Sequence, residues 1–241
     1  TWFDDPEGQF DDFSVKIPKL EREKIGLFYD YAAGGDYLKK IHVDAYTQTI
    51  ERKFENRVKT TQVIPSPAIK ALTINNQTNT NDKQYTQGVT LQGNFSLPAN
   101  NELVIGTQYQ HDKIKQDTDG STRQTAATGF FDTQTRTLSY NEAEQSNTSL
   151  FAQNDWRFAD DWTWTVGARQ YWLSSKLNRN DTQTLQSSGS TWHSTGGNSV
   201  HDDELVTSTS LRYSGFKDLE LRAAYAQGYV FPTLTQLFMQ T

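Results

Sequence analysis

One stretch decides the fold: Asn141–Trp172, NEAEQSNTSLFAQNDWRFADDWTWTVGARQYW. It contains two runs in which apolar and polar residues alternate, and the acidic turn Ala159-Asp160-Asp161 joins them. Alternation over this length predicts two β-strands, because successive side chains of a strand point to opposite faces. We therefore expect an antiparallel hairpin with one apolar face and one polar face.

The apolar face of this hairpin carries a cluster of aromatic residues at its turn end. The residues that share the apolar face are Thr148, Leu150, Ala152, Asn154, Trp156, Phe158, Trp162, Trp164, Val166, Ala168 and Trp172. In a transmembrane β-barrel, lipid covers the apolar face, aromatic residues mark the membrane interface, and water fills a polar lumen. The predicted membrane-interface anchors are Trp156, Phe158, Trp162 and Trp164. A soluble β-sandwich is the alternative, because it explains the alternation, although it does not explain the position of the cluster.

Composition narrows the class of protein. The chain has 241 residues, of which 34% are hydrophobic and 12% aromatic, and its mean hydropathy is -0.76. A chain that is polar on average and rich in aromatic residues fits a barrel whose strands place every second residue on a wet lumen. No run approaches about 18 apolar residues, so we expect no transmembrane helix.

Charge, cysteine content and missing motifs exclude several functions. Cysteine is absent, which excludes disulfides, thiolate metal sites and cysteine nucleophiles. The net charge of -6 and the pI of about 5.2 argue against a nucleic-acid partner. The sequence contains no Gly-any-Ser-any-Gly, no His-Glu-any-any-His and no phosphate loop. We therefore expect neither an enzyme nor a resident cofactor.

Short turns and long polar stretches alternate along the chain. The short turns are expected at residues 32–36, 98–101, 159–161 and 214–218, and the long polar stretches at 60–83, 112–145 and 174–203. Outer-membrane barrels show this pattern, with tight periplasmic turns and long extracellular loops. The inward-facing residues are small, polar or charged, which fits the wide wet wall of a large barrel. The sequence therefore predicts an all-β, antiparallel transmembrane β-barrel segment of about eight to ten strands.

The last stretch, LELRAAYAQGYVFPTLTQLF (219–238), ends in a motif. Gly228 and Pro232 interrupt the strand pattern, which predicts a lumen-facing kink followed by a short helical turn. The motif resembles a mid-barrel strand of the TonB-dependent outer-membrane receptors, aromatic-any-any-Gly-Phe-Arg-Ala-Pro-Thr-Leu-any-Glu-Leu. It spans Tyr225, Gly228, Tyr229, Val230, Phe231, Pro232, Thr233, Leu234, Gln236 and Leu237, with Val230-Phe231 in place of the usual Arg-Ala.

The central hairpin resembles a second recurring pattern of the same family, Phe-any-Gln-Asp followed by Leu-any-any-Gly-Leu-Arg-Tyr. The matching residues are Ser149, Phe151, Gln153, Gly167, Arg169 and Tyr171. The resemblance implies that residues 1–241 are one part of a barrel of about 22 strands. The N-terminal plug domain and the C-terminal strands would lie outside this sequence. The start at Thr1, without Met, leads us to expect an interior piece of a longer protein.

The resemblance also implies a function. It predicts a receptor in the outer membrane of a Gram-negative bacterium that takes up a ferric siderophore. TonB would energise uptake through the missing N-terminal region, while outer-membrane lipid and lipopolysaccharide would surround the barrel. Two alternatives stay open: a haem or haemoglobin receptor of the same family, and a non-transport outer-membrane barrel such as an adhesin or a barrel enzyme.

The long polar stretches contain the candidate ligand contacts. Arg123 and Arg136 could bind an anionic siderophore, although ordinary surface arginines would look the same. Near Trp192, the imidazoles of His193 and His201 are candidate axial ligands of haem, with solvated loop histidines as the alternative. No spacing motif predicts a protein-bound metal ion.

Overall fold

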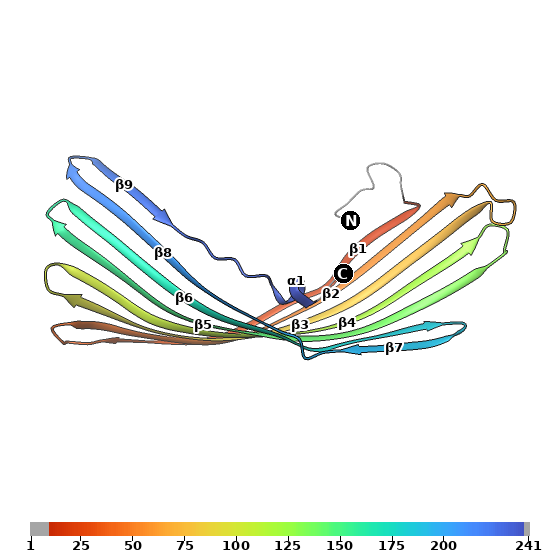
Figure 1. Ribbon diagram of the computed structural model, residues 1–241, viewed down its shortest axis with the longest axis horizontal. Helices are drawn as coiled ribbons and strands as arrows, with labels where there is room; N and C mark the ends of the chain where they lie inside the picture. The colour runs from red at the N-terminus through yellow and green to blue at the C-terminus, as the bar shows by residue number, and fades with distance from the viewer. Residues whose placement is uncertain (1–9, 239–241) are drawn as a thin grey trace.

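Figure 1 shows the computed structural model as one curved antiparallel sheet whose strands bend near their middle. The structure describes residues 10–238. Nine strands form the sheet in the order β1-β2-β3-β4-β5-β6-β8-β9, and β7 pairs with the far part of β6. The elements are β1 (Asp12–Ala32), β2 (Leu38–Val63), β3 (Ala71–Leu97), β4 (Asn101–Ala126), β5 (Asp132–Ala159), β6 (Trp162–Gln186), β7 (Gly189–Thr195), β8 (Ser199–Phe216), β9 (Leu219–Ala226) and α1 (Leu234–Phe238). This open, curved sheet confirms the predicted antiparallel barrel segment.

The expectation of an interior piece rests on the two chain ends, which lie outside the described residues. Within residues 10–238, no helix has both the length and the apolar character needed to cross a membrane.

The central hairpin has the two faces that the sequence predicted. Trp156 pairs with Trp164 and Leu150 pairs with Gln170, so the residues that were expected to share an apolar face do share it. The acidic turn lies between β5 and β6, also as predicted. We call the side of the sheet on which α1 lies the concave face, and Gln153 belongs to it. The opposite side, which carries Leu150 and Trp164, is the convex face.

The convex face carries an apolar band that runs across the sheet. Its exposed members include Leu27, Tyr29, Val89, Leu91, Ile105, Tyr109, Leu150, Trp164, Val166, Leu205, Leu211, Leu221 and Tyr225. An exposed apolar surface of this extent marks contact with lipid or with another protein. Within residues 10–238 a single sheet is present, and no second layer covers this face. The described residues therefore do not form the β-sandwich alternative, which buries its apolar face against a second sheet.

Aromatic rings line the turn end of this band. The ring centroids lie 5.5 Å apart in Trp156 and Phe158, 6.4 Å in Trp156 and Trp164, and 6.3 Å in Phe158 and Trp162. Tyr213 extends the row, with its centroid 4.6 Å from that of Trp162. Rings with an apolar body and a polar edge suit the boundary between hydrocarbon and water. The four predicted anchors thus form one contiguous row at one edge of the apolar band.

The long polar stretches, which the sequence indicated as loops, form strand extensions. β2 and β3 continue to a turn at residues 64–70, β4 and β5 fill most of 112–145, and β6 and β7 fill most of 174–203. Both faces of these extensions are mainly polar, so they show no regular hydrophobic alternation. Ion pairs between neighbouring strands support them instead. These pairs are Lys83 with Glu51, Lys113 with Glu142, Arg123 with Asp132, and Arg136 with Asp119.

The stability of the strand extensions should depend on pH through the carboxyl group of Glu51. Hydrogen bonds from Lys19 and then Lys83 lower the pKa of this carboxyl to about 2. Because the pKa of Glu51 is lower in the folded protein than in the unfolded chain, its carboxylate stabilises the fold at pH values above the unfolded pKa. This stabilisation is lost as the pH falls through the folded pKa. We expect Glu51→Gln to lower the urea midpoint of the full-length protein above about pH 5, and the difference from wild type to vanish near about pH 2. A difference independent of pH in urea titrations would contradict this account.

Candidate functional site

The concave face is a polar wall. One row of paired residues crosses five strand boundaries and contains Lys24, Gln48, Thr86, Asp112, Gln145 and Ser175. Hydrogen bonds preorganise the wall; for example, Arg52 Nε and Gln116 Nε2 each donate to the buried carboxylate of Asp82 at 2.9 Å. A buried polar group whose partners are already in place is costly to rearrange. The concave wall is therefore a fixed polar surface.

A separate segment, residues 227–238, crosses this wall, and we call it the inner strap (Figure 1). It follows β9 without pairing as a strand and ends in α1, so the predicted kink and helical turn are both present. The Tyr229 hydroxyl donates to Asp202 Oδ2 at 2.9 Å, and its ring centroid lies 5.2 Å from that of Tyr171. These contacts fix the first part of the strap to β6 and β8.

The end of the strap packs on an apolar island in the polar wall. Leu234 is only 7% exposed and forms a cluster with Ile114, Ala143 and Leu177 from β4, β5 and β6. Phe238 packs against the same cluster. Apolar side chains on a wall that faces water are stabilised when another apolar side chain covers them. The island therefore explains why Leu234 of the strap docks at this place. Burying one such leucine stabilises the contact by about 1.5–3 kcal/mol.

Leu234→Asp should release the strap from the wall. A charged side chain cannot enter the apolar cluster without a large desolvation cost. We expect proteolysis within residues 227–238 of the full-length protein to become at least about 10-fold faster, which corresponds to about 1.4 kcal/mol of lost docking energy. Leu237→Asp makes the same chemical change in α1 outside the cluster and serves as the control. Equal cleavage rates in both variants would contradict this docking.

A glycine makes room for one aromatic ring on the concave wall. A Cβ atom at Gly88 would lie 2.6 Å from Cζ and 2.9 Å from the hydroxyl of Tyr46, so only glycine lets this ring lie across β3. The Tyr46 hydroxyl reaches 3.4 Å from Gln110 Oε1 on β4. The ammonium of Lys24 lies 4.3 Å from the ring centroid, within the range of a cation–π contact.

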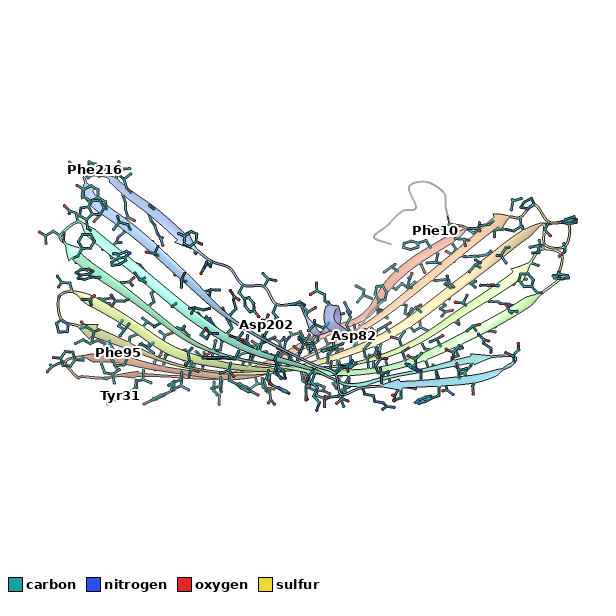
Figure 2. All side chains as sticks on the ribbon, viewed as in Figure 1. Phe10, Tyr31, Asp82, Phe95, Asp202 and Phe216 are labelled. Atoms are coloured by element: carbon teal, nitrogen blue, oxygen red, sulfur yellow. The ribbon has the colours of Figure 1, made fainter. Side chains whose placement is uncertain are left out.

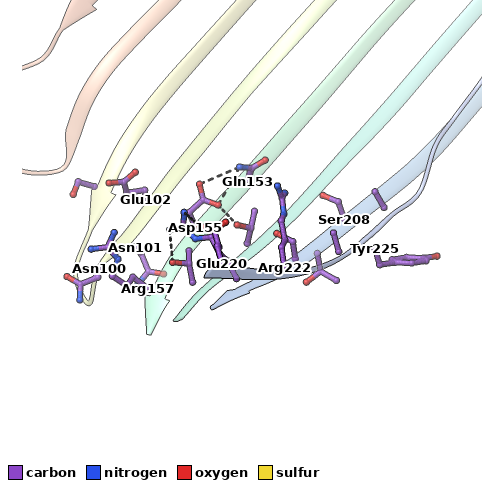
Figure 3. A pocket seen from close by; sticks show the side chains of 18 residues that line it. Asn100, Asn101, Glu102, Gln153, Asp155, Arg157, Ser208, Glu220, Arg222 and Tyr225 are labelled. Carbon is purple, nitrogen blue, oxygen red and sulfur yellow. Dashed lines mark hydrogen bonds and ion pairs between the residues drawn. The ribbon is translucent and has the colours of Figure 1, made fainter. Parts of the chain in front are cut away.

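Two pockets open on the concave face. The first, which we call the turn-end pocket, measures about 680 Å³ and lies where the short turns join β3 to β9 (Figure 3). Its charged residues balance one another: Arg157, Arg212, Arg222, Glu102, Asp155 and Glu220. Asp155 accepts a hydrogen bond from Thr165 at 2.6 Å, and Gln153 also points toward it.

The second pocket, which we call the strap pocket, measures about 510 Å³ and lies between the wall and the strap. Residues Thr233–Thr235 form one side, and Arg22, Lys24, Tyr46 and Asp112 belong to the other. Nothing in the sequence singled out these four residues, because they occur in ordinary polar strand positions. Their association depends on where the strap docks. In Figure 2 the strap reaches the wall near the labels of Asp202 and Asp82.

The structure does not bring the sequence-predicted ligand contacts together. By strand register, Arg123, Arg136, Trp192 and His201 belong to the convex face, and His193 belongs to the concave face. Each of the two arginines pairs with an aspartate. Among residues 10–238 no group of three or more histidine, aspartate or glutamate side chains could hold a metal ion.

A curved antiparallel sheet with an apolar convex face and a polar concave face has the form of a β-barrel wall. The family model described as "TonB dependent receptor-like, beta-barrel" matches residues 1–241. The chain therefore belongs to the TonB-dependent receptor β-barrel family, as the two motifs predicted.

Several solved structures resemble this chain at low sequence identity. The copper transporter OprC is 11% identical to this chain, with a TM-score of 0.36. The alignment covers 88% of this chain and 47% of the OprC chain. The siderophore receptor PiuA from Acinetobacter baumannii is 8% identical and covers 88% and 48%, with a TM-score of 0.27. The ferric yersiniabactin uptake receptor FyuA from Yersinia pestis is 9% identical and covers 91% and 47%, with a TM-score of 0.32. The chain spans about half the length of these structures. No curated protein matches it.

Proposed function

We propose that this chain is part of an outer-membrane receptor of a Gram-negative bacterium that takes up a ferric siderophore with energy from TonB. The observation that carries the proposal is the two-faced sheet: an exposed apolar convex band and a preorganised polar concave wall crossed by the strap. Membership of the TonB-dependent receptor family supports the proposal. In this account the iron complex passes through the lumen of the complete barrel, and the residues of this chain contribute by binding it.

The convex band meets lipid in this proposal. The row of Trp156, Phe158, Trp162 and Trp164 marks the periplasmic boundary, because it lies beside the short turns. The strand extensions beyond the opposite edge of the band project outside the cell, where lipopolysaccharide surrounds them. Their paired charges suit an aqueous environment, in which each exposed ion pair contributes little on its own.

Residues 1–241 are one part of a single barrel domain in this proposal, and a plug domain lies within the lumen of the complete protein. The three arginines and three carboxylates of the turn-end pocket form a charge-balanced, hydrated part of the lumen wall.

Cysteine labelling tests the lipid-facing and lumen-facing assignments. The chain contains no cysteine, so a single introduced thiol reports one position. In the full-length receptor in lipid vesicles, a water-soluble maleimide should label Gln153→Cys on the concave face. Ala152→Cys, one residue away on the convex face, should react only with a lipid-soluble maleimide. Equal labelling of both by the water-soluble reagent would refute the assignment.

Uptake in cells tests the transport function itself. The full-length receptor would be expressed in a Gram-negative strain that lacks its own ferric siderophore receptors, and radioactive iron would be supplied as one siderophore complex at a time. We expect accumulation of iron from at least one complex, and its loss when TonB is absent. Accumulation that does not depend on TonB, or none from any complex, would refute the proposed function.

A further inference from the structure

The strap pocket differs from the turn-end pocket in its charge. Two cations, Arg22 and Lys24, line it together with a single carboxylate, Asp112. That carboxylate already accepts hydrogen bonds from Thr86 at 2.5 Å and from Gln110 at 2.7 Å. The positive charge of the pocket therefore exceeds the negative charge, and the only carboxylate is satisfied by neutral neighbours.

The two cations are free to bind a ligand. Within residues 10–238 neither Arg22 nor Lys24 forms an ion pair. Arg22 Nε donates to the neutral amide oxygen of Gln48 at 2.8 Å, which leaves the terminal nitrogens of the guanidinium available. The ammonium of Lys24 rests over the Tyr46 ring and retains its three N–H donors. By contrast, Arg52 on the same face is neutralised by Asp82.

The geometry matches an anion with several oxygens. Residues two apart on one strand face are separated by about 7 Å, so Arg22 and Lys24 present two positive charges at that spacing. A guanidinium binds a carboxylate through two parallel N–H donors, and an ammonium adds a point charge beside it. Thr233 and Thr235 of the strap, which both carry hydroxyl groups, close the other side.

We propose that Arg22 and Lys24 bind carboxylate groups of the transported iron complex, and thereby select a negatively charged ferric chelate. This inference rests on the proposed function and adds the charge of the ligand to it. The inner strap acts as the opposing wall, because Leu234 anchors it over the island next to Ile114 in the same pocket.

Binding to the full-length receptor tests the inference, with tryptophan fluorescence as the readout. Ferric citrate serves as the anionic chelate and ferrioxamine B as a cationic one. The double variant Arg22→Gln/Lys24→Gln should bind ferric citrate about 10–100-fold more weakly, because two charge-assisted contacts are lost. Its affinity for ferrioxamine B should not fall.

The chain offers a matched control. Arg57 and Lys59 have the same residue types and spacing on the convex face of β2, and neither forms an ion pair within residues 10–238. Arg57→Gln/Lys59→Gln should leave both affinities unchanged.

Each other outcome has a distinct meaning. If the wild type binds a ferric chelate and Arg22→Gln/Lys24→Gln binds it equally well, the inference is wrong and the proposed function stands. An equal loss in both double variants would also overturn it, since total charge would then be the cause. If the wild type binds no iron complex at all, the proposed function fails and this inference fails with it.

Discussion

Leu150→Arg in the full-length receptor is expected to lower the free energy of unfolding in lipid by about 2–4 kcal/mol. Leu150 lies on the convex face and is 52% exposed. It pairs with Thr107 and Gln170, and the apolar residues Ile105, Tyr109, Ala168 and Trp172 lie diagonally beside it on the same face. If lipid covers this face, a guanidinium placed there must either enter hydrocarbon or deform the bilayer around it. Urea-induced unfolding of the receptor in lipid vesicles measures the loss.

Gln153→Arg is the control for that experiment. Gln153 is exposed on the concave face of the same strand and lines the turn-end pocket. Because this side chain meets water, we expect a change within about 0.5 kcal/mol of zero. A loss confined to Leu150→Arg supports a lipid-covered convex face. Little loss in Leu150→Arg would mean that water or protein covers that face.

Gly106→Ala should cost about 1–3 kcal/mol through overpacking. A Cβ atom at this position would overlap the ring of Phe151 and would lie 2.8 Å from the backbone oxygen of Leu91. The ring can turn away, but the backbone oxygen belongs to a strand that is paired on both sides. The loss is measured by the same urea titration in lipid vesicles.

Gly120→Ala provides the comparison on the same strand. Its nearest neighbour would be the backbone oxygen of Thr137 at 3.8 Å, an ordinary contact distance. Alanine there reduces the freedom of the unfolded chain, so we expect no loss and a gain of up to about 1 kcal/mol. In the double variant Gly106→Ala/Phe151→Ala, the clash with the ring is absent, so the combined loss should be smaller than the sum of the single losses. Additive losses would contradict the ring's part in the clash.

The central hairpin and its two faces were predictable from the sequence because those faces meet different surroundings. Leu150 and Trp164 alternate with Gln153 and Arg169, and this contrast is visible in a single sequence. The kink and short helix of the strap were also predictable, since Pro232 lacks the N–H that a strand would need.

The strand extensions were not predictable by the same signal. Both faces of residues 60–83, for example, are polar, so a paired strand and a solvated loop have the same pattern of hydropathy. Their pairing depends on residues from other strands, such as Asp119 beside Arg136. For this reason Arg136 could be identified as a candidate ligand contact but not as half of an ion pair.

The strap pocket could not be predicted either. Arg22 and Lys24 belong to β1, whereas Thr233 belongs to the opposite end of the chain, and only the docking of Leu234 brings them together. The glycine that admits the Tyr46 ring is visible in the sequence, because Gly88 is a glycine inside an otherwise regular strand pattern. Such a glycine indicates a close approach, but not which ring approaches.

The most direct test of the central claim is a titration of the purified full-length receptor with iron complexes, followed by tryptophan fluorescence. Haemin, ferric citrate, other ferric siderophores and cobalamin would be added in turn. We predict saturable quenching by a ferric siderophore. Quenching by haemin alone, with a Soret shift that His193→Ala abolishes, would contradict the siderophore account and identify a haem receptor. No response to any of these ligands would contradict the import function itself.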